Sequence, residues 1–74
     1  MRSTEMERIK QSLRMVRYLA REIRGAQGAK KAEMEALFKD EINLLRRYVS
    51  GDIGFAAMAR SLIEPAFTDL GLRL

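Results

Sequence analysis

A chain of 74 residues without cysteine or histidine cannot form a disulfide or the thiolate and imidazole metal sites that stabilise many small folds. Its 47% hydrophobic and 32% charged residues make it too apolar for a disordered chain and too charged for a membrane span. The formal net charge of +4 is concentrated in residues 1–31, which hold nine basic and three acidic residues, so this half either meets an anionic partner or forms a solvated face.

The first predicted helix covers about residues 4–24. Thr4 and Glu7 have the spacing of a capping box at its start. Gly25 stands where a glycine in the left-handed conformation would end it. The apolar residues between these signals recur at spacings of three and four, which predicts an amphipathic helix with one packing seam: Met6, Ile9, Leu13, Val16, Ala20 and Ile23.

The second predicted helix covers about residues 29–50, after a short connection from Gly25 to Gly28. A connection this short makes the two helices antiparallel neighbours. Gly51 is expected to end the second helix as another left-handed glycine. Its apolar row, again at spacings of four and three, is expected to face the first helix: Phe38, Ile42, Leu45 and Val49.

A third, shorter helix is predicted over about residues 53–63, with Asp52 as its cap. Glu64-Pro65 is expected to stop this helix, because proline lacks an amide donor and restricts the residue before it. Residues 65–74 then form a C-terminal turn, ended by Gly71, and a tail that carries three leucines.

Together these elements predict an all-α fold with residues 1–74 in one helical domain: an antiparallel helical hairpin of two long helices plus a short third helix, in a small helical bundle. A core of this size contributes only about 3–5 kcal/mol, so a second subunit or a partner chain is an expected source of further stability. No apolar run approaches the roughly 20 residues that cross a bilayer. The first residues also lack the apolar core of a signal peptide, so we expect a cytoplasmic protein.

The residue types that perform catalysis are scarce in this chain. Histidine and cysteine, the usual base and the strongest nucleophile, are absent, and the serines fall in no catalytic motif. Asp40 and Glu41 are adjacent on a helix, so they do not converge on a metal or a substrate. We expect Glu41 to pair with an arginine of the first helix instead. The sequence predicts neither an enzyme nor a cofactor, a metal or a small-molecule substrate.

Nucleic-acid binding is the alternative function that the sequence leaves open. Four arginines of the first helix advance by three and four along one side and could meet a phosphate backbone: Arg14, Arg17, Arg21 and Arg24. Against this, the predicted third helix is rich in alanine and contains one basic residue, Arg60. Such a helix is poorly suited to reading a DNA groove. The first helix could also lie on a membrane, but its narrow seam without tryptophan or phenylalanine is better explained by packing.

The function we expect is non-catalytic binding to another protein, as a regulator, adaptor or chaperone-like subunit. Both long helices carry more apolar positions than one hairpin contact buries, and methionines suit adaptable binding surfaces. The expected partner is another protein or a second copy in a homodimer. A third helix and tail that fold back over the hairpin would bury the same side chains, and both outcomes can coexist. The candidate contact residues are Met15, Leu19, Leu44, Phe55, Met58, Leu62, Phe67 and Leu72.

Overall fold

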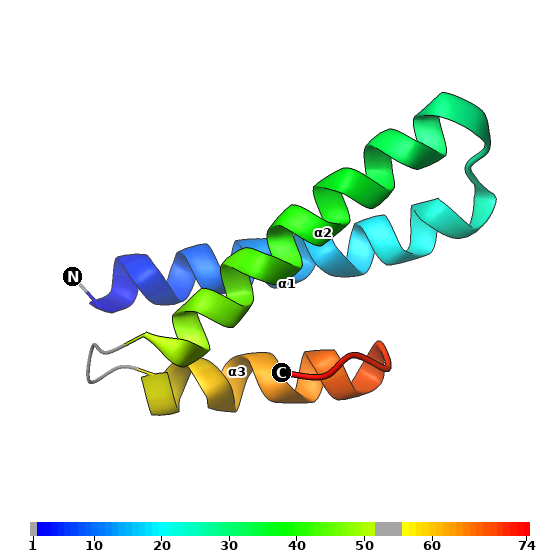
Figure 1. The fold of residues 1–74 in the computed structure, drawn as a ribbon. Helices are drawn as coiled ribbons and strands as arrows, with labels where there is room; N and C mark the ends of the chain where they lie inside the picture. The colour runs from blue at the N-terminus through cyan, green and yellow to red at the C-terminus, as the bar shows by residue number, and fades with distance from the viewer. Residues whose placement is uncertain (1, 52–55) are drawn as a thin grey trace.

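Three α-helices make up the part of the chain that the computed structural model describes, residues 2–51 and 56–74. They are α1 (Arg2–Gly25), α2 (Gly28–Ser50) and α3 (Ala56–Asp69), and the described residues contain no strand. Figure 1 shows α1 and α2 crossing as an antiparallel hairpin, with α3 alongside the half that is remote from the hairpin turn. The predicted all-α hairpin with a short third helix is confirmed.

Helix α1 buries the middle of the predicted seam, while Met6, Ala20 and Ile23 toward its ends are half-buried. Ile9 and Val16 are fully buried, and Leu13 retains 8% of its surface. The helix begins at Arg2, before the predicted start, so Thr4 lies inside it. The expected capping box of Thr4 and Glu7 is therefore wrong, because a residue within the helix cannot serve as its N-cap.

The turn between α1 and α2 uses a different glycine from the one expected. Gly25 is the last residue of α1 and has no positive φ, whereas Gly28 has a φ of 63° at the first residue of α2. Gln27, between them, is extended at φ −139° and ψ 157°. The chain thus reverses at Gly28, where the missing Cβ allows a left-handed φ. The prediction that Gly51 ends α2 in a left-handed conformation is also wrong, because its backbone is extended at φ −70° and ψ 150°.

Helix α3 continues through Pro65 to Asp69, so the expected stop at Pro65 is wrong. Proline removes one backbone hydrogen bond, which would otherwise run to the carbonyl four residues earlier. The three apolar residues around it, at spacings of three and one, all face the core and offset this loss: Ile63, Ala66 and Phe67, each at most 1% exposed. The predicted beginning of this helix, Asp52 and Ile53, lies outside the described residues.

The C-terminal turn ends at Gly71, as predicted, in a Schellman motif. Gly71 has a φ of 73°, its N–H donates to the carbonyl of Thr68 at 3.1 Å, and the N–H of Leu72 donates to the carbonyl of Phe67 at 2.7 Å. Leu72 thereby packs against the core, and Nη2 of Arg46 donates to the carbonyl of Arg73 at 2.8 Å. The tail is docked against α2.

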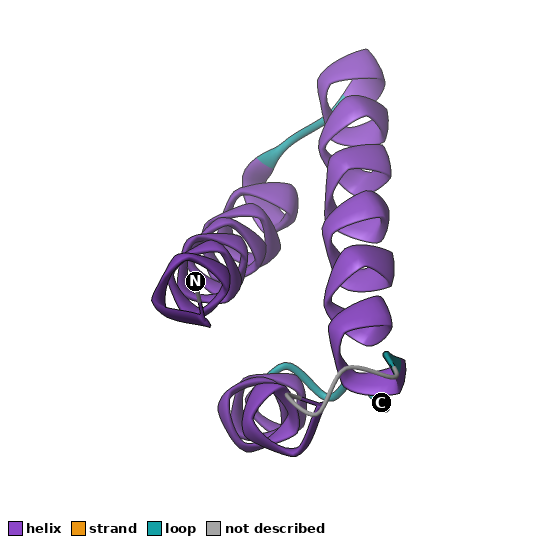
Figure 2. Ribbon diagram, turned by 90° about the vertical axis from the view of Figure 1, so that its left-hand side faces the viewer, coloured by secondary structure: helices purple, strands orange, loops and turns teal. Residues whose placement is uncertain are grey.

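The core lies where all three helices meet, and Figure 2 shows α3 beneath both members of the hairpin. The core is built from one face of each helix. At its edge, the guanidinium carbon of Arg46 lies over the ring of Phe67, 5.9 Å from the ring centroid. Within residues 2–51 and 56–74, no helix combines the length and apolarity that a membrane crossing needs. The buried members of the core cluster are Ile9, Leu13, Val16, Ile42, Leu45, Ala59, Ile63, Ala66 and Phe67.

Candidate interaction surface

Four of the eight predicted contact residues contribute to the core of a single chain. Leu19 and Phe67 are buried, with 3% and 1% of their surface exposed. Leu62 and Leu72 are half-buried and pack against the core cluster. These side chains stabilise the packing of the three helices, and Leu19 and Phe67 present no surface to a partner. Phe55 lies outside the described residues.

The other three predicted contact residues remain exposed: Met15 at 47%, Leu44 at 40% and Met58 at 43%. Met15 and Leu44 lie on α1 and α2, and Met58 lies on α3. The structure therefore divides this group, with two members on the hairpin and one on the helix that packs beneath it.

The exposed members of the hairpin have two apolar neighbours that are not among the predicted contact residues. Tyr18, three residues after Met15, is 53% exposed, and Leu37, seven residues before Leu44, is 55% exposed. These spacings place each pair on one side of its helix. We call the surface formed by Met15, Tyr18, Leu37 and Leu44 the open face. The same spacings are visible in the sequence, but they do not show which side α3 leaves uncovered.

Two adjoining hollows follow the open face on the side of the hairpin that lacks α3. They share Gln11 and Met15, and no described side chain of α3 lines either of them. Both hollows therefore meet at the exposed side chain of Met15. The hollow between the helices has a volume of about 380 Å³ and is lined by Arg8, Gln11, Ser12, Met15, Glu41, Leu44 and Tyr48. The second, of about 500 Å³, is lined by Gln11, Arg14, Met15 and Tyr18.

The floor of the hollow between the helices holds a polar contact. The hydroxyl of Ser12, only 5% exposed, donates to Oε1 of Glu41. Glu41 therefore faces α1 as expected, but the expected arginine partner is wrong. Arg14 and Arg17 lie along another side of that helix, since they are two and five residues from Ser12. Arg8, four residues before Ser12, lines the same hollow as Glu41, but no ion pair joins these two described residues. The Ser12–Glu41 contact fixes which turn of α1 lies level with which turn of α2.

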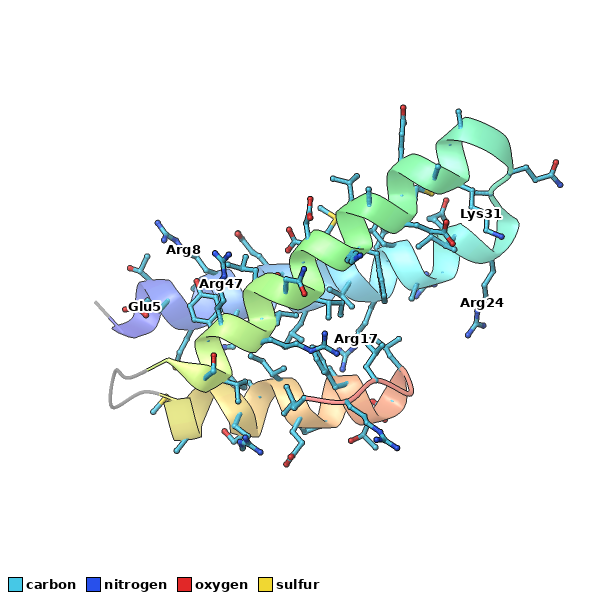
Figure 3. All side chains as sticks on the ribbon, viewed as in Figure 1. Glu5, Arg8, Arg17, Arg24, Lys31 and Arg47 are labelled. Atoms are coloured by element: carbon cyan, nitrogen blue, oxygen red, sulfur yellow. The ribbon has the colours of Figure 1, made fainter. Side chains whose placement is uncertain are left out.

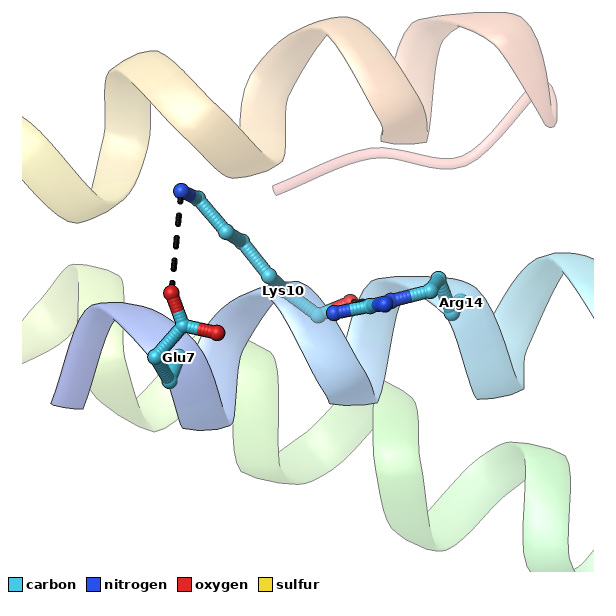
Figure 4. A network of polar contacts seen from close by, with 3 residues as sticks. All are labelled: Glu7, Lys10 and Arg14. Atoms are coloured by element: carbon cyan, nitrogen blue, oxygen red, sulfur yellow. Dashed lines mark hydrogen bonds and ion pairs between the residues drawn. The ribbon is translucent and has the colours of Figure 1, made fainter. Parts of the chain in front are cut away.

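The arginine row is exposed along α1, but its members differ in their surroundings. Arg17 points toward α3, where its Nη2 lies 4.0 Å from Oδ2 of Asp69, while Arg24 projects near the hairpin turn (Figure 3). Nε of Arg14 donates to the carbonyl of Lys10 at 3.4 Å. Nζ of Lys10 in turn lies 3.9 Å from Oε1 of Glu7 (Figure 4). Arg21, which lies between Arg17 and Arg24 along the helix, is also exposed.

Comparison with protein-family models, with curated proteins and with solved structures found no match to this chain. The residues that the structure describes also contain no group of three acidic residues placed to hold a metal ion. The open face and the arginine row are the two surface features described above.

Proposed function

We propose that the protein is a non-catalytic interaction module that binds another protein chain along the open face. One observation carries this proposal: four large apolar side chains remain 40–55% exposed on one side of the hairpin, although α3 covers the other side. Because each of these side chains is already about half covered, a partner that buried it fully would gain roughly half of the 1.5–3 kcal/mol that burying a fully exposed side chain contributes. Exposed apolar side chains that gather on one side of a small protein are a common feature of binding sites.

The chemistry of the surface suits a helical protein partner. Methionine adapts its shape to a neighbour, and tyrosine is enriched among the residues that dominate interface energies. Arg8 and Gln11 are exposed, line the same hollow and supply polar groups beside its apolar residues. A groove between two helices that presents apolar side chains is a common site for binding the apolar face of an amphipathic helix.

A photo-reactive amino acid in place of Leu44 tests the proposal in the cells that produce the protein. The matched control carries the same group in place of Glu64, which is exposed on α3 and forms an ion pair with Arg60, one turn away on its own helix. We expect a protein adduct from position 44 and none from position 64, and we expect the additional substitution Met15→Arg to abolish the adduct. Equal yields from both positions, or no adduct from position 44, would overturn the proposal.

The arginine row supports a second candidate, binding to a nucleic-acid backbone. Arg14, Arg21 and Arg24 are exposed and take part in no ion pair within the described part of the chain. Four phosphate contacts would reduce affinity for duplex DNA about 100-fold between 50 and 200 mM salt. Changing these three arginines to glutamine should abolish binding of a labelled duplex and leave the adduct from position 44 unchanged. Weak, salt-independent binding by the unchanged protein would exclude this second candidate.

A further inference from the structure

The chain exposes more surface than a compact monomer of its size. Monomers of 8.5 kDa have about 4,700 Å² of accessible surface, whereas this chain has 5420 Å². Its radius of gyration, 12.9 Å, likewise exceeds the roughly 11 Å of a compact domain with 74 residues. The excess area of roughly 700 Å² is close to the 800 Å² or so that each partner buries in an interface of standard size.

One stretch of α1 and one stretch of α2 beside the open face carry opposite charge, although α2 as a whole has five basic and four acidic residues. Residues 8–21 of α1 contain five basic residues and no acidic one, whereas residues 33–41 of α2 contain four acidic residues and one lysine. Among the described residues, no ion pair joins α1 to α2. Arg8 points away from α3 in Figure 3. Arg14 lines the hollow around Met15 and Tyr18, and also a second one that includes Leu13 and Arg17. This complementarity is therefore not used inside one chain and remains available to a second one.

The Ser12–Glu41 contact determines which charges a second copy would meet. It puts residue 12 of α1 level with residue 41 of α2, so Arg14 and Asp40 lie within about 3 Å of the same height along the hairpin. A two-fold axis parallel to the hairpin preserves these heights and lays α1 of each copy on α2 of the other. A two-fold axis across the hairpin would instead lay α1 on α1 and bring like charges together.

From these observations we infer that the occupant of the open face is a second copy of this chain, related by a two-fold axis parallel to the hairpin. The two hairpins form a four-helix bundle. Met15, Tyr18, Leu37 and Leu44 lie inside it, and Arg14 of each copy lies opposite Asp40 of the other. This inference rests on the proposed function, because it names the partner that the open face binds.

Sedimentation analysis of the purified chain over a wide range of concentration tests this inference. We expect a monomer–dimer equilibrium in which Leu44→Arg raises the dissociation constant by about 100-fold or more. Met58→Arg is the matched control, because Met58 is as exposed as Leu44 but lies on α3. This control should change the dissociation constant by less than about threefold. Circular dichroism of each variant shows whether the helices are retained.

Charge reversal tests the orientation of the two copies. Arg14→Glu and Asp40→Arg each create two like-charge contacts in a homodimer, so each should weaken self-association about tenfold. A mixture of these two variants forms a heterodimer in which both contacts join opposite charges. It should therefore associate about as tightly as the unchanged protein. A contact within one chain would show no such preference for the heterodimer, and the absence of rescue in the mixture would overturn the proposed arrangement.

Two further outcomes separate this inference from the proposed function. In the first, the chain stays monomeric at every concentration while position 44 still forms an adduct with a different protein. This result would contradict the homodimer but would still support the proposed interaction module. A monomeric chain that forms no adduct from position 44 overturns both. An adduct of twice the chain mass that Met15→Arg abolishes supports both.

Discussion

The two sides of the α1–α2 hairpin carry similar apolar side chains but differ in what lies against them. On the side that faces α3, which we call the covered face, Ile9, Ile42 and Leu45 are at most 4% exposed. On the open face, Met15 and Leu44 retain 47% and 40% of their surface. The contrast is sharpest between neighbours, since Leu44 and Leu45 are consecutive residues of one helix.

This difference shows that α3 decides which apolar residues become core. The hairpin alone offers apolar side chains on two sides, and a third helix of 14 residues covers one of them. Ile63 and Phe67 supply the side chains that fill the space between α3 and the covered face. The side without such a cover is the part of the surface that a partner can use.

The largest effect is expected from removing the side chain that joins α3 to the covered face. Phe67→Ala deletes the largest fully buried side chain and should cost about 3–5 kcal/mol. A core of this size yields about as much in total, so the variant should be largely unfolded. Circular dichroism during urea titration measures this. A free energy of unfolding within about 1 kcal/mol of that of the unchanged protein would contradict the central place of Phe67.

The adjacent leucines of α2 provide the most direct comparison of the two faces. Leu45→Ala should cost about 2–5 kcal/mol because Leu45 is fully buried, whereas Leu44→Ala should cost less than about 1 kcal/mol in a monomer. Urea midpoints at chain concentrations low enough to keep the protein monomeric measure both. Equal losses would show that the two faces do not differ in their cover.

The helices and their inward faces can be predicted from the sequence because they depend on local signals. Spacings of three and four place Ile9, Val16 and Leu45 on the packing faces of their helices, and all three are fully buried. Local signals fail where packing overrides them. Pro65 indicates a stop, but Phe67, two residues later, is buried only if the helix continues.

The candidate surface is harder to predict for the same reason. Met15 and Leu19 both flank the seam of α1, one turn apart, and both are expected from the sequence to contact a partner. Leu19 is 3% exposed and Met15 is 47% exposed. The position of α2 and α3 around α1 separates these two residues, and no pattern within α1 contains that information.

A smaller effect is expected from the turn that folds the tail over the covered face. Gly71→Ala forces a side chain into a φ of 73° and should cost about 1–2 kcal/mol. Gly25→Ala is the matched control, because Gly25 ends α1 without a positive φ and has no atom within 4 Å of an added Cβ. It should stabilise the protein by up to about 1 kcal/mol. Thermal unfolding distinguishes the two, and a shift of the same sign in both would contradict the left-handed turn.

The smallest effect concerns the polar contact where the covered and open faces meet. Ser12→Ala removes the hydroxyl that donates to Glu41 and should cost about 1 kcal/mol, because the half-buried carboxylate loses its partner in α1. Ser61→Ala is the control, since this exposed hydroxyl donates to the carbonyl of Met58 in its own helix at 2.7 Å. Both changes improve helix propensity by a similar few tenths of a kcal/mol, so this contribution cancels in their difference. A difference in unfolding free energy near zero would show that the Ser12–Glu41 contact does not hold α1 against α2, and the register inferred for Arg14 and Asp40 would lose its basis.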